Sequence, residues 1–153
     1  MDHVRLAAVA DLRLTNVPRH VDVDDGGVLT VVEGGNNVAF RIARVFTLHA
    51  PIGAIRGMHA HRRCTQFMIC PQGEVKISCE DAVEQKTFLL DRNDVGLLIP
   101  PSIWISEEFR RDKSLLVVVC DRPYEADDYI RDYGEFRTWR NERNARTEGN
   151  SIL

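Results

Sequence analysis

Short runs of β-favouring residues, divided by frequent turn signals, constrain the fold of this chain more than any other feature. The runs are rich in Val, Ile and Phe, and Gly, Pro or Asn residues stand between most of them. Such spacing is typical of all-β sandwiches and barrels. The runs that we expect to form strands cover residues 28–33, 41–49, 55–61, 65–70, 74–80, 83–90, 95–100, 103–109 and 114–120.

Two of these runs also indicate how they are buried. In residues 74–80, Val75, Ile77 and Cys79 alternate with polar residues, so we expect these three side chains to face a core. Residues 114–120 are almost entirely apolar, which predicts a strand that is covered on both faces.

The C-terminal part has a different pattern. Residues 125–144 follow Pro123 and begin acidic and end basic, which favours a helix. Residues 145–153 show no periodicity, and we expect them to be loose. We therefore divide the chain into a lead-in strand or arm (1–23), a β domain (24–136), and the end of the helix with a tail (137–153).

Composition excludes several classes of protein. The formal net charge of -3 argues against a general nucleic-acid binder. No apolar run approaches the roughly 20 residues of a membrane span, and the N-terminal apolar stretch is too short for a signal peptide. The four cysteines form no CxxC pair, which argues against a zinc knuckle. Without a secretion signal, we expect reduced thiols and a location in the cytoplasm.

The candidate chemistry lies in the run 55–61. His59 and His61 stand two residues apart on a predicted strand, so their side chains point to the same face. That face either lines the interior of the barrel or is exposed to solvent. We favour the interior. Burying two imidazoles on one short strand is costly, so we expect their burial to serve a function.

The spacing around the two histidines resembles the first motif of the cupins. Gly53, His59-x-His61, Gln66 and Gly73 follow one another at the motif's intervals, with Gln66 where a metal-binding cupin usually has Glu. The amide of Gln66 is a weaker metal ligand than a carboxylate. This difference favours a site that does not depend on a metal.

The region of the second cupin motif points the same way. It reads IPPSIWI, with Ser102 in place of the motif's glycine and Ile105 in place of its histidine. A catalytic metal needs about three strong protein ligands, although His49 could in principle substitute. We therefore predict no metal and no cofactor, and assign His59 and His61 to acid–base work.

Four motifs in order carry a further resemblance. RxxRVF, RGxHAHRxxxQ, LDRxxxGLxIPPxxW and PYxxDDYIRDYxEF are similar to the nucleotide-sugar 3,4-ketoisomerases, the WxcM/FdtA-like cupins, over about residues 24–136. The resemblance implies a metal-free cupin-type jelly-roll β-barrel. It also implies dTDP-4-keto-6-deoxyglucose as the substrate, and a homodimer with exchanged N-terminal strands.

The implied reaction moves a carbonyl group from C4 to C3 of the sugar through an enediol. It needs a general base with a pKa near neutrality, which histidine provides. We expect His61 or His59 to remove the C3 proton and the other to orient it or return the proton. Arg44, Arg56 and Gln66 are candidates for holding the enediolate and the pyrophosphate.

Two aromatic features leave alternatives open. Trp104 either lines the mouth of the pocket or is a core residue. Many family members have tyrosines where this chain has Phe46 and Thr47, so the catalytic acid is unassigned. The only tyrosines are in the C-terminal segment, at positions 124, 129 and 133.

The missing tyrosines allow other functions. One is a catalytically silent dTDP-sugar-binding module, and another is an epimerase on the same scaffold. A metal-dependent cupin dioxygenase ranks last. Glu107 and Glu108 form a tempting acid pair, but alternation lets only one of them face inward, and a solvated edge is the simpler interpretation.

Overall fold

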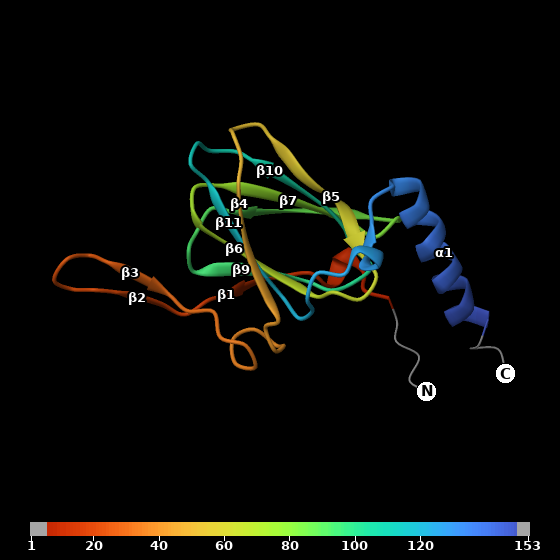
Figure 1. Ribbon diagram of the computed structural model, residues 1–153, viewed down its shortest axis with the longest axis horizontal. Helices are drawn as coiled ribbons and strands as arrows, with labels where there is room; N and C mark the ends of the chain where they lie inside the picture. Colours follow the sequence, from red (N-terminus) through yellow and green to blue (C-terminus); the bar gives the residue numbers. More distant parts are fainter. Residues whose placement is uncertain (1–5, 150–153) are drawn as a thin grey trace.

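The computed structural model describes residues 6–149, and two five-stranded antiparallel sheets form most of it (Figure 1). The all-β, jelly-roll prediction is confirmed. The first sheet has the order β1 (Leu14–Asn16), β9 (Val95–Ile99), β6 (Gln66–Gln72), β11 (Leu115–Cys120) and β4 (Arg44–His49). The second has the order β12 (Tyr129–Ile130), β5 (Ile55–His61), β10 (Trp104–Phe109), β7 (Val75–Glu80) and β8 (Gln85–Leu90).

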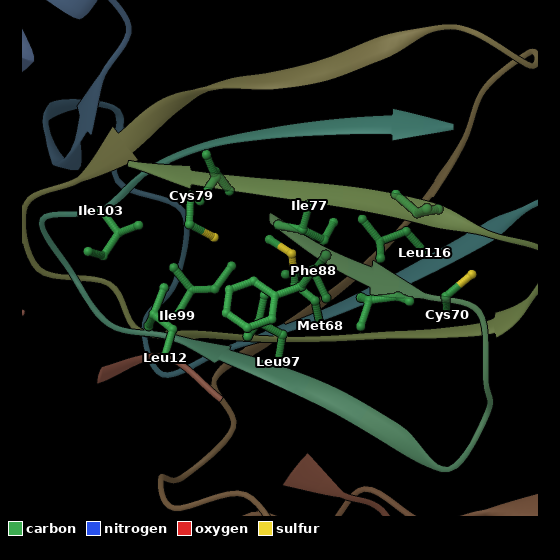
Figure 2. Close-up of a cluster of buried hydrophobic side chains, with 14 of the residues drawn as sticks. Leu12, Met68, Cys70, Ile77, Cys79, Phe88, Leu97, Ile99, Ile103 and Leu116 are labelled. Atoms are coloured by element: carbon green, nitrogen blue, oxygen red, sulfur yellow. The ribbon is translucent and has the colours of Figure 1, made fainter. Parts of the chain in front are cut away.

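All nine predicted strands are present, as β3 (Val28–Thr30) to β11 in chain order. The inward residues Val75, Ile77 and Cys79 of β7 are fully buried, as the alternation predicted. They pack in the main core between the two sheets (Figure 2). Met68 and Leu116 belong to the same cluster and come from the opposite sheet, so this core joins the two layers.

Each sheet is also covered on part of its outer face. Residues 31–43 cover the first sheet, where Val38 packs against Phe67 and Val119. The apolar strand β11 is therefore covered on both faces, as predicted. The second sheet carries a smaller cluster in which Ile130 and Phe136 pack beside Trp104.

The N-terminal residues extend both the sheet and the surface. The 3-10 helix η1 (Val9–Asp11) is followed by β1, which pairs with β9 of the same chain. The strands β2 (Arg19–Val21) and β3 (Val28–Thr30) then form a separate hairpin that projects away from the two sheets (Figure 1). The boundary predicted between residues 23 and 24 falls in the turn of this hairpin.

The helix α1 (Tyr133–Gly149) begins later and ends later than we predicted. Residues 126–130 form instead the 3-10 helix η2 (Ala126–Asp128) and β12. The helix starts where the Asp132 carboxylate accepts a hydrogen bond from the Glu135 backbone N–H at 2.8 Å, an N-terminal cap. Residues 145–149 are helical rather than loose, and the rest of the predicted tail, 150–153, lies outside the described residues.

Arg140 fixes α1 to the sheets. Its buried guanidinium donates hydrogen bonds to the backbone carbonyls of Ser102 and Ala7. Within residues 6–149, no helix combines the length and the apolar character that crossing a membrane requires.

Candidate active site

Strand β5 presents His59 and His61 to the space between the sheets. His59 lies opposite Ile105 of β10, which is 1% exposed, and His61 lies opposite Tyr129 of β12. The two imidazole rings meet edge to face, with their centroids 4.9 Å apart. The predicted juxtaposition on one strand face is therefore present, and the face is interior.

A β-bulge precedes the two histidines. Ile105 pairs with His59 but its neighbour Ser106 pairs with Gly57, so Met58 is an extra residue in β5. Gly57 and Met58 have φ angles of 76° and 56°. A side chain at position 57 would be strained at this φ and would place its Cβ 3.2 Å from the Ile105 carbonyl oxygen. The glycine therefore permits the bulge beside the histidine pair.

Asp128 holds His61. The Nδ1 atom of His61 lies 2.7 Å from Asp128 Oδ2, and both side chains are buried. The other carboxylate oxygen accepts the backbone N–H of Arg63 at 2.6 Å. Because a carboxylate only accepts hydrogen bonds, the ring proton belongs on Nδ1. The buried Nε2 atom has no hydrogen-bond partner in residues 6–149, so its lone pair is available to act as a base.

The environment keeps both imidazoles neutral near neutral pH. Burial, followed by the neighbouring His61, lowers the pKa of His59 to about 4. Burial also lowers the pKa of His61, and the hydrogen bond from its ring to Asp128 offsets part of that effect. A neutral imidazole whose basicity is supported by a carboxylate is suited to removing a proton.

A tyrosine of β12, Tyr129, lies beside both histidines. Its ring centroid lies 4.4 Å from that of His61 and 5.0 Å from that of His59. Arg44 of β4 donates a hydrogen bond from Nη2 to the Tyr129 hydroxyl oxygen at 3.0 Å. The guanidinium of Arg131 also lies over the Tyr129 ring, 4.4 Å from its centroid. The site therefore bridges the edge strands of the two sheets.

Gln66, Cys120 and Arg44 are neighbours across three adjacent strands of the first sheet. Cys120 of β11 lies opposite Gln66 of β6 on one side and opposite Arg44 of β4 on the other. The structure thus brings the two predicted substrate-binding residues Arg44 and Gln66 to one end of the sheet. Sequence reasoning missed Cys120, Asp128 and Tyr129 at this site.

The sequence also matches a known protein family. A family model described as FdtA, WxcM-like, C-terminal, matches residues 10–141 of the chain. The chain belongs to the WxcM-like family. The four sequence motifs that suggested this family all lie within the matched residues.

Its relatives include characterised sugar isomerases. The WxcM-like chain is 31% identical to the TDP-4-oxo-6-deoxy-α-D-glucose-3,4-oxoisomerase of Aneurinibacillus thermoaerophilus over 129 residues, which are 83% of the chain and 92% of the relative. Its fold matches QdtA, a sugar 3,4-ketoisomerase of Thermoanaerobacterium thermosaccharolyticum solved with TDP, with a TM-score of 0.82, 29% identity, and coverage of 88% and 98% of the two chains. A 3,4-ketoisomerase of Helicobacter canadensis matches with a TM-score of 0.80, 28% identity, and coverage of 86% and 98%.

Two predicted site residues lie apart from this cluster in the WxcM-like fold. Arg56 is exposed and precedes the bulge, opposite Glu107. Trp104 lies opposite Ala60, on the outward face of the second sheet, where its ring packs against Phe136. Trp104 is therefore a core residue beneath α1, the second of the two interpretations, and we leave it out of the proposed site.

Three buried residues of the site could together hold a metal ion. His61, Cys64 and Asp128 place one donor atom each within 4.8 Å of one another. However, His61 and Asp128 are hydrogen-bonded to each other, and the Cys64 thiol lies 3.5 Å from the Thr65 carbonyl oxygen. We assign this group as a hydrogen-bonded network. His49, which we considered as a substitute metal ligand, lies on the exposed face of β4. The metal independence of the reaction stays a prediction.

Glu107 contradicts the interpretation of a solvated acid pair. Alternation does separate the two residues: Glu108 pairs with Lys76 at the surface, whereas Glu107 faces the core and is 2% exposed. The Glu107 Oε2 atom has no hydrogen-bond partner among the described residues. Burial raises the pKa of Glu107 to about 7, partly offset by the charge of Arg56.

Replacing Glu107 by glutamine should stabilise the protein relative to wild type, and this advantage should grow as the pH rises. The unfolded carboxyl titrates near 4.5 and the folded one near 7, so the folded state binds more protons between these values. Wild-type stability is therefore lost as the pH rises through this window, by up to roughly 3 kcal/mol. Urea unfolding at about pH 5 and about pH 8 measures the difference. Glu108→Gln is the matched control, and an advantage equal at both pH values would contradict the prediction.

Proposed function

We propose that this chain is an isomerase that moves the keto group of a dTDP-4-keto-6-deoxyhexose from C4 to C3. The observation that carries the proposal is a buried His61 with its Nδ1 held by Asp128, its Nε2 unpartnered, and a tyrosine against its ring. This constellation belongs to a chain whose relatives are 3,4-ketoisomerases and 3,4-oxoisomerases.

His61 is the proposed general base. The C3 proton is acidic because the C4 carbonyl stabilises the carbanion that its removal leaves. Neutral His61 takes that proton on Nε2, and the resulting imidazolium is stabilised by the Asp128 carboxylate. The imidazolium later delivers the proton to C4, which completes the transfer. His59 stays neutral and orients the sugar through its ring nitrogens.

Tyr129 is the proposed acid for the sugar oxygens. Its oxygen already accepts a hydrogen bond from Arg44, so its own hydrogen is available to donate to O4 as the enediol forms. The phenol then recovers a proton from O3 as the C3 carbonyl forms. Arg44 stabilises the negative charge that passes through the phenol and the enediolate.

The remaining groups bind the rest of the substrate. Arg131 adds a second positive charge beside Tyr129. Arg56 is exposed and lies apart from the histidines, so a contact between Arg56 and the pyrophosphate stays a prediction. Gln66 is buried in the barrel with an Oε1 atom that has no partner among the described residues, which suits a hydrogen bond from a sugar hydroxyl. The chain uses no cofactor in this proposal.

The silent binding module was favoured by the missing tyrosines. Tyr129 removes that reason, because a phenol from another strand lies against both histidines. The cytoplasmic location that we propose is supported by four free, buried cysteines.

Proton exchange tests the proposed function. The protein is incubated with dTDP-4-keto-6-deoxyglucose in deuterated water, and the sugar is followed by NMR. We expect loss of the C3 proton signal and appearance of the 3-keto product. Bound substrate with neither change would contradict the function and favour the silent module.

We also propose a homodimer, as the family resemblance implies. The projecting hairpin leaves Val21, Val28 and Leu29 between 46% and 59% exposed, an apolar strip that a second copy would cover. Exchange of N-terminal strands would replace the pairing of β1 with its own β9 by the same pairing between chains. Light scattering should give about twice the 17.4 kDa chain mass, and 17.4 kDa at all concentrations would contradict the dimer.

A further inference from the structure

A buried cysteine contacts the same arginine as the proposed catalytic tyrosine. Cys120 ends strand β11, is fully buried, and has Arg44 and Gln66 as its neighbours on the two adjacent strands. The mechanism proposed above assigns no role to it. Its sulfur nevertheless contacts the same guanidinium group that holds the Tyr129 hydroxyl.

Two donor groups point at the Cys120 sulfur. Arg44 Nη2 approaches to 3.6 Å and Gln66 Nε2 to 3.8 Å. A neutral thiol would direct its own hydrogen at an acceptor, whereas two donors on one sulfur, one of them a guanidinium, match a thiolate.

The charges around the sulfur fit the same assignment. Within residues 6–149, Arg44 has no carboxylate within 4.0 Å, so its guanidinium has no conventional ion-pair partner there. Asp121 and Asp128 act on Cys64 and favour its protonated form. A thiolate at Cys120 would neutralise the half-buried Arg44 without a second carboxylate, besides that of Asp128, close to the histidines.

We propose that Cys120 is a thiolate that positions Arg44 against the Tyr129 hydroxyl. This inference rests on the proposed function. Arg44 uses one nitrogen, Nη2, to contact both the sulfur and the phenol oxygen, so the sulfur fixes where that nitrogen lies. Cys120 is a positioning residue in this assignment, because it acts on the substrate only through Arg44 and Tyr129.

The pKa values of the two neighbouring thiols shift in opposite directions, as the assignment requires. The neighbouring Cys64 thiol and the positive charge of Arg44 lower the pKa of Cys120. The neighbouring Cys120, together with burial, raises the pKa of Cys64. Burial raises the pKa of Cys70 to about 11 and that of Cys79 to about 12, so these two thiols stay protonated near neutral pH.

A titration of thiolate absorbance in the ultraviolet tests the charge without substrate. We expect the wild-type protein to show one thiolate that titrates below the ordinary thiol value of about 8.5. The signal should disappear in Cys120→Ser and persist in Cys79→Ala, a buried cysteine of the same core. A wild-type protein without a thiolate below that value would overturn the proposal, whether or not the serine variant folds.

Turnover tests the positioning role. We expect Cys120→Ser, which keeps the size of the side chain but not the charge, to lower kcat at least about tenfold with little change in KM. Cys120→Asp, which restores a negative charge, should recover part of kcat. A serine variant that folds and keeps wild-type kcat would refute the positioning role. Failure of the proposed function is distinguishable, because the wild-type protein itself would then form no product.

Discussion

Replacing His61 by asparagine should lower kcat for ketoisomerisation by at least about a hundredfold. Asparagine can still donate a hydrogen bond to Asp128, but it has no lone pair basic enough to take the C3 proton. The loss should appear in C3 exchange as well as in product formation, because both depend on the same proton transfer. NMR in deuterated water measures the two rates together.

The control for this prediction is another histidine of the same barrel. His49→Asn changes an imidazole on the exposed face of β4 and should leave the rate unchanged. Titration with dTDP should show that His61→Asn still binds the nucleotide. Rapid C3 exchange in a folded His61→Asn protein would move the role of base to His59.

Replacing Tyr129 by phenylalanine is expected to lower kcat by about a hundredfold while nucleotide binding is largely kept. Phenylalanine retains the ring that packs against both imidazoles but removes the oxygen that accepts the Arg44 hydrogen bond. The enediol then forms without a proton donor at O4. Single-turnover kinetics at saturating substrate measures this effect apart from binding.

Tyr133→Phe is the matched control for the second prediction. Tyr133 lies at the start of α1 and packs on Trp104, on the far side of the second sheet from the histidines. It should keep wild-type turnover. A Tyr129→Phe protein with normal kcat would show that the reaction uses another acid, and would leave the phenol with a packing role.

The strands and the histidine pair could be predicted from the sequence because local patterns determine them. Turn residues separate most of the strands, and a spacing of two residues places His59 and His61 on one face whatever the rest of the fold does. The resemblance to the ketoisomerases could be recognised for the same reason, because its motifs are short and local. These features needed no knowledge of which strands pair.

Asp128 and Tyr129 could not be predicted because their roles depend on a pairing between distant segments. The stretch ADDYIRDYGEF has acidic residues where a helix would begin, and we extended the helix across it. The spacing of Asp132 and Glu135 is a cap signal that would have moved the start to Tyr133. The residues before it then become free to pair with β5, which places Tyr129 opposite His61.

Glu107 shows a second limit of sequence patterns. Alternation indicated that at most one of the two glutamates faces inward, but not that the inward one would be 2% exposed. Burial depends on how β10 is enclosed by β5 and β7, which only the assembled sheets determine.

The pairing of β12 with β5 also sets the time at which the protein becomes active. Residues 44–61 leave the ribosome long before residues 128 and 129, and domains fold as units while synthesis proceeds. A nascent or prematurely ended chain therefore carries imidazoles with neither a carboxylate to hold them nor a phenol beside them. Such a chain lacks two of the groups that the proposed reaction needs, so we expect activity only after β12 has paired with β5.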